Sequence, residues 1–429
     1  MKKILSFALS LLLIAGLAAC GAGTVTPDPT EIPTEAPTAI PTAEPTAAPT
    51  PEPTAEPTPA PTPEPEAKYN EHDMEMILAF LETKDADGVT NGAKCFEGYD
   101  PEDPETWHAE YANINWSNGS EMRLVEIGIG FRAVVGTLDV SGCTELRELT
   151  CWSSECNIDR INASGCTKLK ELNCNDCYTV REIILTGCTA LNDLQFECNL
   201  VESIDLTGLS SITQIFCPEN RLEELDVSDC VNLKTLNCSR NRLKTLDLSA
   251  LNGLKEVYCS QNKIKKLDLS GNSGLKYLAC GNNKLTELKL GGCTALVELS
   301  AENNSLSSID VTACAALDSL DVRNNSLTVL DLSGNPVLWT LYSSGNRLTK
   351  LDLMNNNMLS FRYVAVSGNG TIGYDINYRQ ETEEDTLYAV AGEGAVFLGW
   401  YTEDGQLIST NPTLSAWEST TPRVVAKFS

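Results

Sequence analysis

The sequence predicts an α+β solenoid, a stack of short coils sharing one parallel β-sheet, with a helix-containing cap before it and a small β-domain after it. A Leu-x-(Cys or apolar) triplet recurs every 21 residues, at Cys217, Cys238, Cys259, Cys280, Ala301, Val322 and Ser343. A second triplet, similar to Leu-Asp-Leu-Ser, recurs in the gaps at the same interval, at Leu225, Leu246, Leu267, Leu288, Ile309, Leu330 and Leu351. Repeats this short cannot bury their apolar side chains alone, so neighbouring coils must stack into one continuous core.

The first 19 residues have the pattern of an export signal. Met1 to Lys3 is positively charged, residues 4–16 are apolar, and Leu-Ala-Ala-Cys follows at 17–20. This ending resembles the lipobox of bacterial lipoproteins, and the resemblance implies that Cys20 is acylated and anchors the protein to a membrane. An ordinary cleaved signal peptide is the alternative. No later stretch reaches the ~18 to 20 apolar residues of a membrane span.

The segment from Cys20 to residue 67 is predicted to lack a core. From Thr24 onward it consists almost wholly of Pro, Thr, Ala and Glu. Proline-rich chain favours the extended polyproline II conformation, so some 40 residues would span on the order of 120 Å at ~3.1 Å each. A stiff stalk and a disordered tether are both compatible with this composition.

Charge and histidine content restrict the classes of function. The chain has 59 Asp plus Glu against 31 Lys plus Arg, a formal net charge of −28, which argues against nucleic acid and anionic surfaces as partners. The two histidines, His72 and His108, lie outside the repeats. Acid-base catalysis would therefore depend on carboxylates, and no isolated carboxylate pair stands out. We predict no catalytic residue and no enzyme activity.

Residues 68–123 are predicted to form an N-terminal cap on the solenoid. Between Asn70 and Lys84, one helical face carries Met74, Ile77, Leu78 and Leu81. Leu124 to Ile129 then fits a first, irregular coil. The triplet spacing widens to 23 residues between Cys151 and Cys174 and to 22 between Cys174 and Phe196, so we expect the extra residues to bulge into turns.

Residues 124–364 follow the pattern Leu-x-x-Leu-x-Cys-x-x-Asn-x-Leu, as in Leu233 to Leu243. The pattern resembles the leucine-rich repeat, and its cysteine column resembles the cysteine-ladder internalins of bacterial surfaces. About 10 to 11 coils of 21–23 residues are expected. In an extended segment alternate residues share a face, so Leu236 and Cys238 point inward while Thr235 and Asn237 point outward. The recurrent asparagine is interpreted as structural, because its amide can satisfy backbone groups where the chain leaves the strand.

Residues 365–429 lack the repeat and read as short strands separated by turn residues. The Phe-x-Gly-Trp-Tyr run at 397–401 and the Val-Ala-Lys-Phe ending at Phe428 resemble the small β-domain of internalin B-type repeats. The resemblance implies a small C-terminal β-domain.

The 17 cysteines are interpreted as packing residues and not as disulfides, because column cysteines one coil apart lack the side-chain vectors that a disulfide needs. Zinc is the alternative at Cys174-x-x-Cys177 together with Cys151 and Cys156. An aspartate column in the second triplets is interpreted as a solvated convex face. Asp85-x-Asp87-Gly88 is only a fragment of a calcium loop. We predict no metal and no cofactor.

The outward positions of the main sheet supply the predicted binding site. Seven residues are expected to contact a ligand there: Trp152, Phe216, Glu256, Tyr258, Tyr277, Glu298 and Tyr342. Aromatic groups among carboxylates suit contact with a protein or a glycan, although isolated surface aromatics with no ligand are common.

The predicted function is a monomeric, lipid-anchored protein on the bacterial cell surface that binds a protein or glycan on a host, on a neighbouring cell or in its own envelope. A passive envelope spacer and a carboxylate-dependent surface hydrolase are the alternatives.

Overall fold

The computed structural model describes residues 68–130, 132–357, 359–377, 384–416 and 421–429. The predicted export signal, the predicted lipidation site Cys20 and the proline-rich segment lie outside these residues. Within the described part of the chain, no helix has both the length and the apolar character needed to cross a membrane.

The N-terminal cap combines two helices with short strands. Its elements are β1 (Lys68–Tyr69), α2 (Glu71–Leu81), α3 (Asn91–Cys95), a 3-10 turn (Pro104–Thr106), β2 (His108–Ala109), β3 (Ala112–Trp116) and β4 (Glu121–Met122). The predicted helix is confirmed as α2, and Asn70 caps it by accepting a hydrogen bond from the Asp73 amide. Its buried face differs from the prediction: Asp73 and Phe80 are buried beside Ile77 and Leu81, whereas Met74 and Leu78 are only partly buried.

Asp73 is buried at the cap because it has a charged partner. Its carboxylate accepts hydrogen bonds from the Arg123 guanidinium at 2.7 and 3.0 Å and from the Leu124 amide at 2.9 Å. A buried carboxylate is tolerated when it is paired and hydrogen-bonded in this way. This ion pair ties α2 to the first coil.

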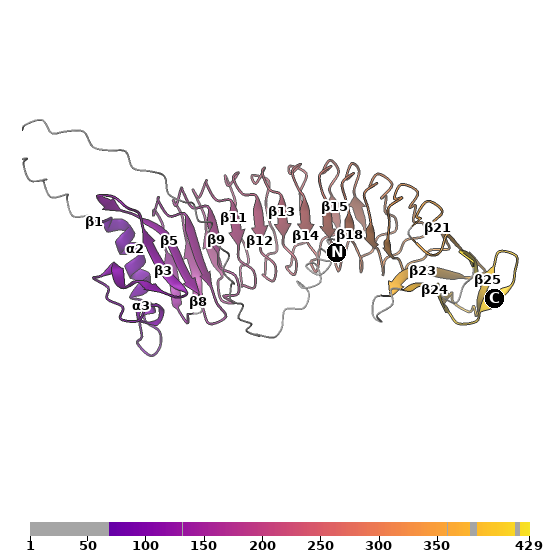
Figure 1. Ribbon diagram of the computed structural model, residues 1–429, viewed down its shortest axis with the longest axis horizontal. Coiled ribbons are helices and arrows are strands. Elements are labelled where there is room, and N and C mark those ends of the chain that lie inside the picture. Colours follow the sequence, from indigo (N-terminus) through magenta and orange to yellow (C-terminus); the bar gives the residue numbers. More distant parts are fainter. Residues whose placement is uncertain (1–67, 131, 358, 378–383, 417–420) are drawn as a thin grey trace, which may run out of the picture. The chain divides into compact units, whose positions relative to one another are not determined.

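The main sheet has 13 strands, and its repeat strands pair in parallel and in register. They are β5 (Leu124–Gly130), β7 (Glu148–Trp152), β9 (Glu171–Asn173), β11 (Asp193–Gln195), β12 (Gln214–Phe216), β13 (Thr235–Asn237), β14 (Glu256–Tyr258), β16 (Tyr277–Ala279), β18 (Glu298–Ser300), β19 (Ser319–Asp321) and β20 (Thr340–Tyr342). Cap strands β2 and β3 extend the sheet antiparallel beyond β5. The repeat strands stand side by side along the stack (Figure 1).

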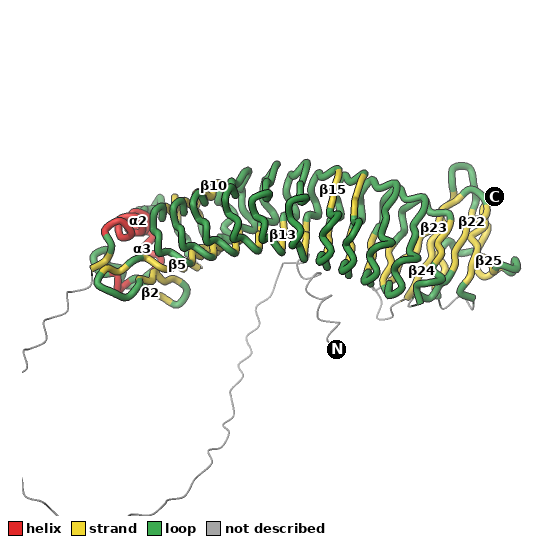
Figure 2. The backbone as a smooth tube through the Cα atoms, turned by 90° about the horizontal axis from the view of Figure 1, so that it is seen from above, coloured by secondary structure: helices red, strands yellow, loops and turns green. Residues whose placement is uncertain are grey.

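Two smaller sheets lie on the opposite side of the coils. Strands β6 (Val135–Asp139), β8 (Asn157–Asn162) and β10 (Glu182–Ile184) form one of them, and β15 (Lys266–Asp268) and β17 (Glu287–Lys289) form the other. Figure 2 shows the main sheet on the inner, concave side of the curved stack and β10 and β15 on the outer side. The larger outer sheet falls in the early coils, where the spacing of the repeats is widest.

The core is a set of buried columns, one residue per coil. The leucine and cysteine positions predicted to face inward, such as Leu236 and Cys238, are fully buried. All sixteen cysteines in the described ranges are free, and only Cys198 among them is half-exposed. In the second cysteine column, thiols donate to a backbone carbonyl of the preceding coil, as Cys166 does to Val140 at 3.1 Å and Cys188 to Ala163 at 3.0 Å. The prediction that these cysteines are packing residues is confirmed.

The asparagine column holds consecutive coils together. The Asn241 side chain donates to the carbonyl oxygens of Cys217 at 2.9 Å and Cys238 at 3.1 Å, and accepts from the Leu222 amide at 3.0 Å. The residue before it, Arg240, has φ of 55°, which turns the chain away from the strand. Similar bonds recur from Asn199 to Asn346, so the structural interpretation of this column is confirmed.

The C-terminal part contains two small sheets. One consists of β21 (Lys350–Asp352), β22 (Tyr363–Ser367), β28 (Arg423–Phe428), β25 (Phe397–Thr402) and β26 (Leu407–Ser409), and the other of β23 (Gly370–Asn377), β24 (Glu384–Ala391) and β27 (Thr413–Ser415). Strand β22 spans the predicted boundary between residues 364 and 365 and pairs with β21, so the coil stack and the β-domain share a sheet.

Strand β23 covers the end of the coil stack. The Ser343 amide donates to the Tyr374 carbonyl at 2.8 Å, just as the Val322 amide one coil earlier donates to Tyr342 at 2.9 Å. The Asp375 carboxylate also accepts from the Ser343 and Ser344 amides. Strand β23 therefore supplies the hydrogen-bond acceptors that a further coil would supply.

Candidate ligand-binding face

Three neighbouring strands bring together four of the seven predicted contact residues. Register pairing places Tyr277 of β16 between Glu256 of β14 and Glu298 of β18, and places Tyr258 beside Ala279. Adjacent strands are ~4.8 Å apart, so these side chains are neighbours on the outward face. Backbone pairing continues just beyond the strands, where the Asn282 amide donates to the Glu302 carbonyl at 2.8 Å. Gly281 and Glu302 are therefore neighbours as well. We name this patch the central lattice and define it as Glu256, Tyr258, Tyr277, Ala279, Gly281, Glu298, Ser300 and Glu302.

The other three predicted contacts lie outside the central lattice. Phe216 is in the column of Tyr258 but two strands earlier, with Asn237 between them. Trp152 is 36% exposed on β7, five strands before β14. Tyr342 lies on β20, four strands after β14, where the Arg323 guanidinium sits 4.5 Å from its ring centroid. The seven residues therefore share one face without forming one patch.

Tyr258 is fixed by its neighbour on the same strand. Its hydroxyl donates to the Glu256 carboxylate at 3.2 Å, and the side chain is half-buried. Burial, with the Glu256 carboxylate beside it, raises the pKa of Tyr258 well above the usual tyrosine value. Its phenol is thus neutral at physiological pH and presents a fixed aromatic surface.

Glu302 is a member of the site that the sequence pattern did not single out. Its carboxylate accepts hydrogen bonds from the Ser300 hydroxyl at 2.6 Å and from the Asn282 amide group at 2.9 Å. It lies over Gly281, where a Cβ atom would overlap the carboxylate. The alternation of side chains predicts that Glu302 points outward. Where its carboxylate lies depends on Gly281 in the adjacent coil, and the sequence of one repeat does not show this dependence.

The carboxylates of the central lattice are partly removed from water. Burial raises the pKa of Glu298, with Asp318 adding to the shift, and burial likewise raises the pKa of Glu302. None of the ion pairs between described residues includes Glu256, Glu298 or Glu302. The Lys255 ammonium lies against Gly274 in a loop, and Arg323, whose charge opposes part of the Glu302 shift, pairs with Asp321.

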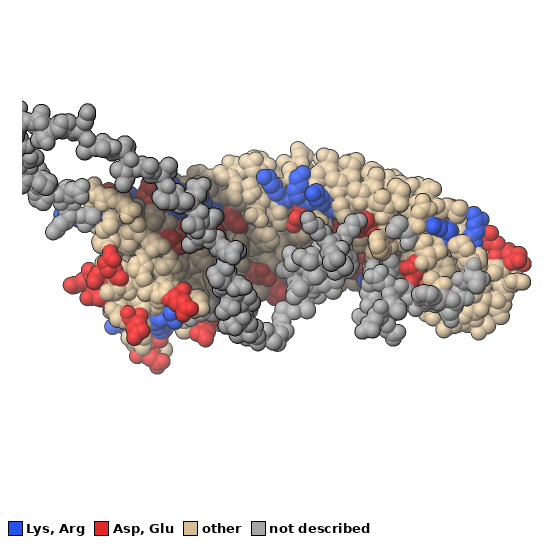
Figure 3. All heavy atoms as spheres, in the orientation of Figure 1, with Lys and Arg blue, Asp and Glu red and all other residues tan. Residues whose placement is uncertain are grey.

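Acidic side chains continue toward the cap. Glu126, Glu148, Glu171 and Asp193 occupy the same register position on four successive repeat strands. Burial raises the pKa of Glu171, and the charges of Glu148 and Asp193 raise it further. Figure 3 shows acidic side chains in the hollow of the stack and a group of basic side chains above them. The concave face is therefore predominantly acidic along the line of these strands.

The predicted zinc alternative gains no support from the structure. The Cys177 thiol donates to the Cys151 carbonyl at 2.9 Å, as an asparagine does in later coils. Across the described ranges, one group of three potential ligands is close enough for a metal, and it consists of His72, Asp73 and Cys143. There Asp73 is already bonded to Arg123, and His72 Nε2 contacts the Ser141 carbonyl at 2.8 Å. We assign this group a structural role in the cap.

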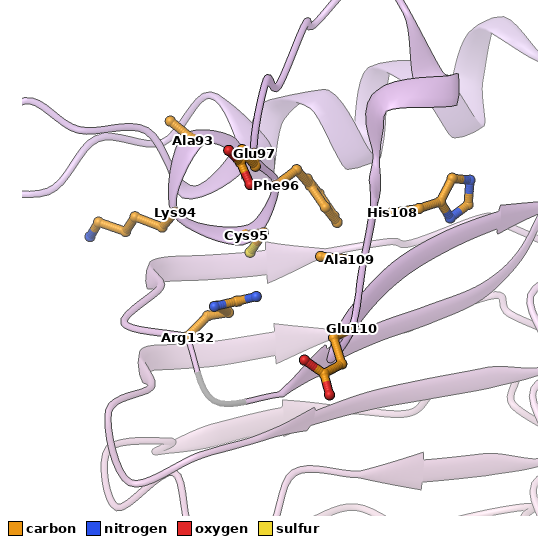
Figure 4. Close-up of a pocket in the computed structure, with 9 residues that line it drawn as sticks. All are labelled: Ala93, Lys94, Cys95, Phe96, Glu97, His108, Ala109, Glu110 and Arg132. Carbon is orange, nitrogen blue, oxygen red and sulfur yellow. The ribbon is translucent and has the colours of Figure 1, made fainter.

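A depression of about 550 Å³ in the cap is a weaker candidate site. It is lined by Ala93, Lys94, Cys95, Phe96, Glu97, His108, Ala109, Glu110 and Arg132. Figure 4 shows Arg132 extending toward Cys95 while the His108 ring points away from both. Burial raises the pKa of Cys95 to about 12, and Lys94 is held by Asp85 at 2.6 Å. This combination offers neither an activated nucleophile nor a paired base.

The in-register parallel sheet, the 21-residue coils and the asparagine column define a leucine-rich repeat solenoid. The family model described as "Leucine Rich repeats (2 copies)" matches residues 231–271. The predicted fold is thereby confirmed.

Solved structures share this fold at low sequence identity. The chain is similar to the functional domain of InlJ from Listeria monocytogenes, whose description includes a cysteine ladder, with 22% identity, TM-score 0.49 and coverage of 66% of this chain and 76% of that one. It is also similar to the internalin InlF from Listeria monocytogenes, with 19% identity, TM-score 0.38 and coverage of 53% of this chain and 85% of that one. A chain of the PEPR1–AtPEP1 structure matches with 18% identity, TM-score 0.50 and coverage of 64% of this chain and 42% of that one. No curated protein sequence matches, and the comparisons indicate no catalytic family.

Proposed function

We propose that this chain is a non-catalytic binding protein that recognises a protein partner through the concave face of its repeats. The central lattice is the observation that carries this proposal. It places two tyrosines and two carboxylates on adjacent strands of a preformed sheet, with the Glu302 carboxylate just beyond the end of β18, and all five side chains are half-buried. Aromatic groups in rigid positions provide large contact area at low entropic cost, which suits a protein interface.

We further propose display at a bacterial cell surface. The support is the sequence of the first 67 residues, whose signal pattern ends at Cys20 and whose proline-rich segment would hold the repeats away from a membrane. Metabolic labelling with a palmitate analogue tests the anchor: wild type should be labelled, and Cys20→Ala should not.

The two rival functions make different demands on the same face. A hydrolase needs a carboxylate placed beside a second catalytic group, whereas Glu302 is bonded to Ser300 and Asn282 and Glu256 is bonded to Tyr258. A passive spacer needs no outward-facing aromatic residues on its inner face. Binding is the function that uses both the tyrosines and the carboxylates.

Affinity capture from extracts of host and neighbouring cells tests binding. Wild type is compared with a triple variant, Phe216→Ala, Tyr258→Ala and Tyr277→Ala, and with Val329→Ala/Met354→Ala, which removes exposed apolar side chains from outside the concave face. We expect the triple variant to lose a specific partner that the control retains, while thermal unfolding stays nearly unchanged. Equal capture by all three proteins would favour the spacer, and retention of a glycan on an array would change the class of partner.

A further inference from the structure

We propose that the central lattice is a subsite for a cationic side chain, lysine or arginine, carried by an extended segment of the protein partner. The inference rests on the proposed binding function and specifies the chemistry of its ligand. Geometry, charge and the positions of the chain's own cations all support it.

The middle of the central lattice has small side chains surrounded by larger ones. Ala279 faces outward on the central coil, in a position that other coils fill with Asn237 or Tyr258, whereas Gly281 beside it is buried under Glu302. Tyr258 lies on one side of Ala279 and Ser300 on the other. A side chain from a partner therefore meets little steric resistance above Ala279, next to the Glu302 carboxylate that covers Gly281.

The surrounding groups favour a cation. Tyr277 is flanked in register by Glu256 and Glu298, and the Glu302 carboxylate is fixed over Gly281 by Ser300 and Asn282. A cation within about 6 Å of a tyrosine ring is attracted to its face, and carboxylates on two sides add charge-assisted hydrogen bonds. Anionic or apolar side chains would gain neither interaction.

The charge on these carboxylates is only partly compensated within the described part of the molecule: Arg323 favours the ionised form of Glu302, but neither Glu298 nor Glu302 forms an ion pair there. Glu298 and Glu302 are partly desolvated, which disfavours their ionised form. The Lys255 ammonium lies against Gly274, and Arg323 pairs with Asp321 and lies over the Tyr342 ring. A partner's cation would offset this penalty on binding. The chain's own residues 24–67 contain no lysine or arginine, so they do not supply it.

A binding assay with a matched peptide pair tests the proposal. The probe is a fluorescein-labelled nine-residue peptide of alternating glycine and lysine, and its twin carries acetyl-lysine at every lysine position. Both are titrated against the full chain by fluorescence anisotropy. Wild type should bind the lysine peptide at least about tenfold more tightly than the acetylated peptide, because acetylation removes the charge.

Two variants with equal charge changes locate the interaction. Glu298→Gln/Glu302→Gln should weaken lysine-peptide binding about tenfold, whereas Asp226→Asn/Asp247→Asn, on the exposed second triplets, should stay within about twofold. The control keeps the side-chain oxygens that accept from Ser228 and Ser249. Equal losses of affinity in the two variants would indicate diffuse attraction to an acidic protein and would overturn the subsite. Equal binding of the lysine and acetyl-lysine peptides to wild type would overturn it too. If the triple variant at Phe216, Tyr258 and Tyr277 loses its captured partner but wild type binds both peptides equally, the cation subsite is refuted and the proposed binding function stands.

Discussion

At the scale of single residues, the position where the backbone leaves each repeat strand needs a side chain that donates a hydrogen bond to the preceding coil. Asparagine fulfils this need in most coils, and Cys177 fulfils it once, since its thiol donates to the Cys151 carbonyl at 2.9 Å where Asn199 donates to the Cys174 carbonyl at 2.7 Å. The side chains differ, but both satisfy a buried carbonyl that strand pairing leaves open. The position therefore selects a hydrogen-bond donor, and asparagine adds an acceptor for the next coil.

Replacing Asn241 by alanine should lower the free energy of unfolding substantially. The change removes the donors to the Cys217 and Cys238 carbonyls and the acceptor of the Leu222 amide, all in buried or nearly buried surroundings. Unsatisfied buried groups cost about 1–3 kcal/mol each, so a loss on the order of 3 kcal/mol is expected. Urea unfolding measures it, and the exposed Asn252→Ala should change stability by no more than about 0.5 kcal/mol. Equal effects of the two changes would contradict the role assigned to the column.

Native thiols should react slowly with iodoacetamide at pH 8. Cys198 is the most accessible cysteine in the described ranges, but burial together with the nearby Glu219 raises its pKa to about 12, so little thiolate exists at that pH. Fully buried thiols such as Cys217 are inaccessible as well. Mass spectrometry should find at most Cys198 modified in the folded protein and all thiols modified in urea. Rapid labelling of several thiols without denaturant would argue against the packed cysteine columns.

At the scale of elements, the repeats were predictable and their ends were not. Period and alternation alone determine that Leu236 and Cys238 face inward and that Glu256 and Tyr258 face outward, because each coil repeats its neighbour's environment. The buried Asp73 of α2 was missed because its partner, Arg123, is 50 residues away. The fixed position of Glu302 was also missed, since it depends on a glycine in another coil.

Acidification should have opposite effects on binding and on stability at the central lattice. The pKa values of Glu298 and Glu302 are raised by burial above the ordinary 4.5, so both groups take up protons at a higher pH when the protein is folded. The stability that protonation of Glu298 and Glu302 provides is fully present below pH 4.5, and it is lost as the pH rises through their raised pKa values. Binding of the lysine peptide, which needs the charged form, should follow the reverse course and weaken as the pH falls through them.

Paired titrations measure both effects. Anisotropy gives peptide affinity against pH, and urea unfolding gives stability over the same range. Glu298→Gln/Glu302→Gln should flatten the binding profile and raise stability at neutral pH, because it removes the desolvated charges. A binding profile that is unchanged in this variant would mean that other carboxylates control the interaction.

At the scale of the whole array, each coil contacts mainly the coil before it and the coil after it. Stability is then close to a sum of coil and interface contributions, so the two ends need separate protection. Cap strand β3 covers one end by pairing with β5, and β23 covers the other through Tyr374 and Asp375. The capping strand β23 was not predictable from periodicity, because the pattern ends before it begins.

Removing one complete coil should therefore preserve the fold, whereas removing one residue more should not. Deletion of residues 233–253 takes out 21 residues, joins Asn232 to Leu254 and leaves every column in phase. Deletion of 233–254 shortens the next coil and places Lys255 in a buried leucine position, which a lysine cannot occupy without a large desolvation cost. The first protein should unfold cooperatively with somewhat reduced stability and still bind the lysine peptide, since β14, β16 and β18 remain adjacent. The second should show no cooperative unfolding transition by circular dichroism and should not bind the peptide. Similar behaviour of the two deletions would show that the coils are not held in strict register.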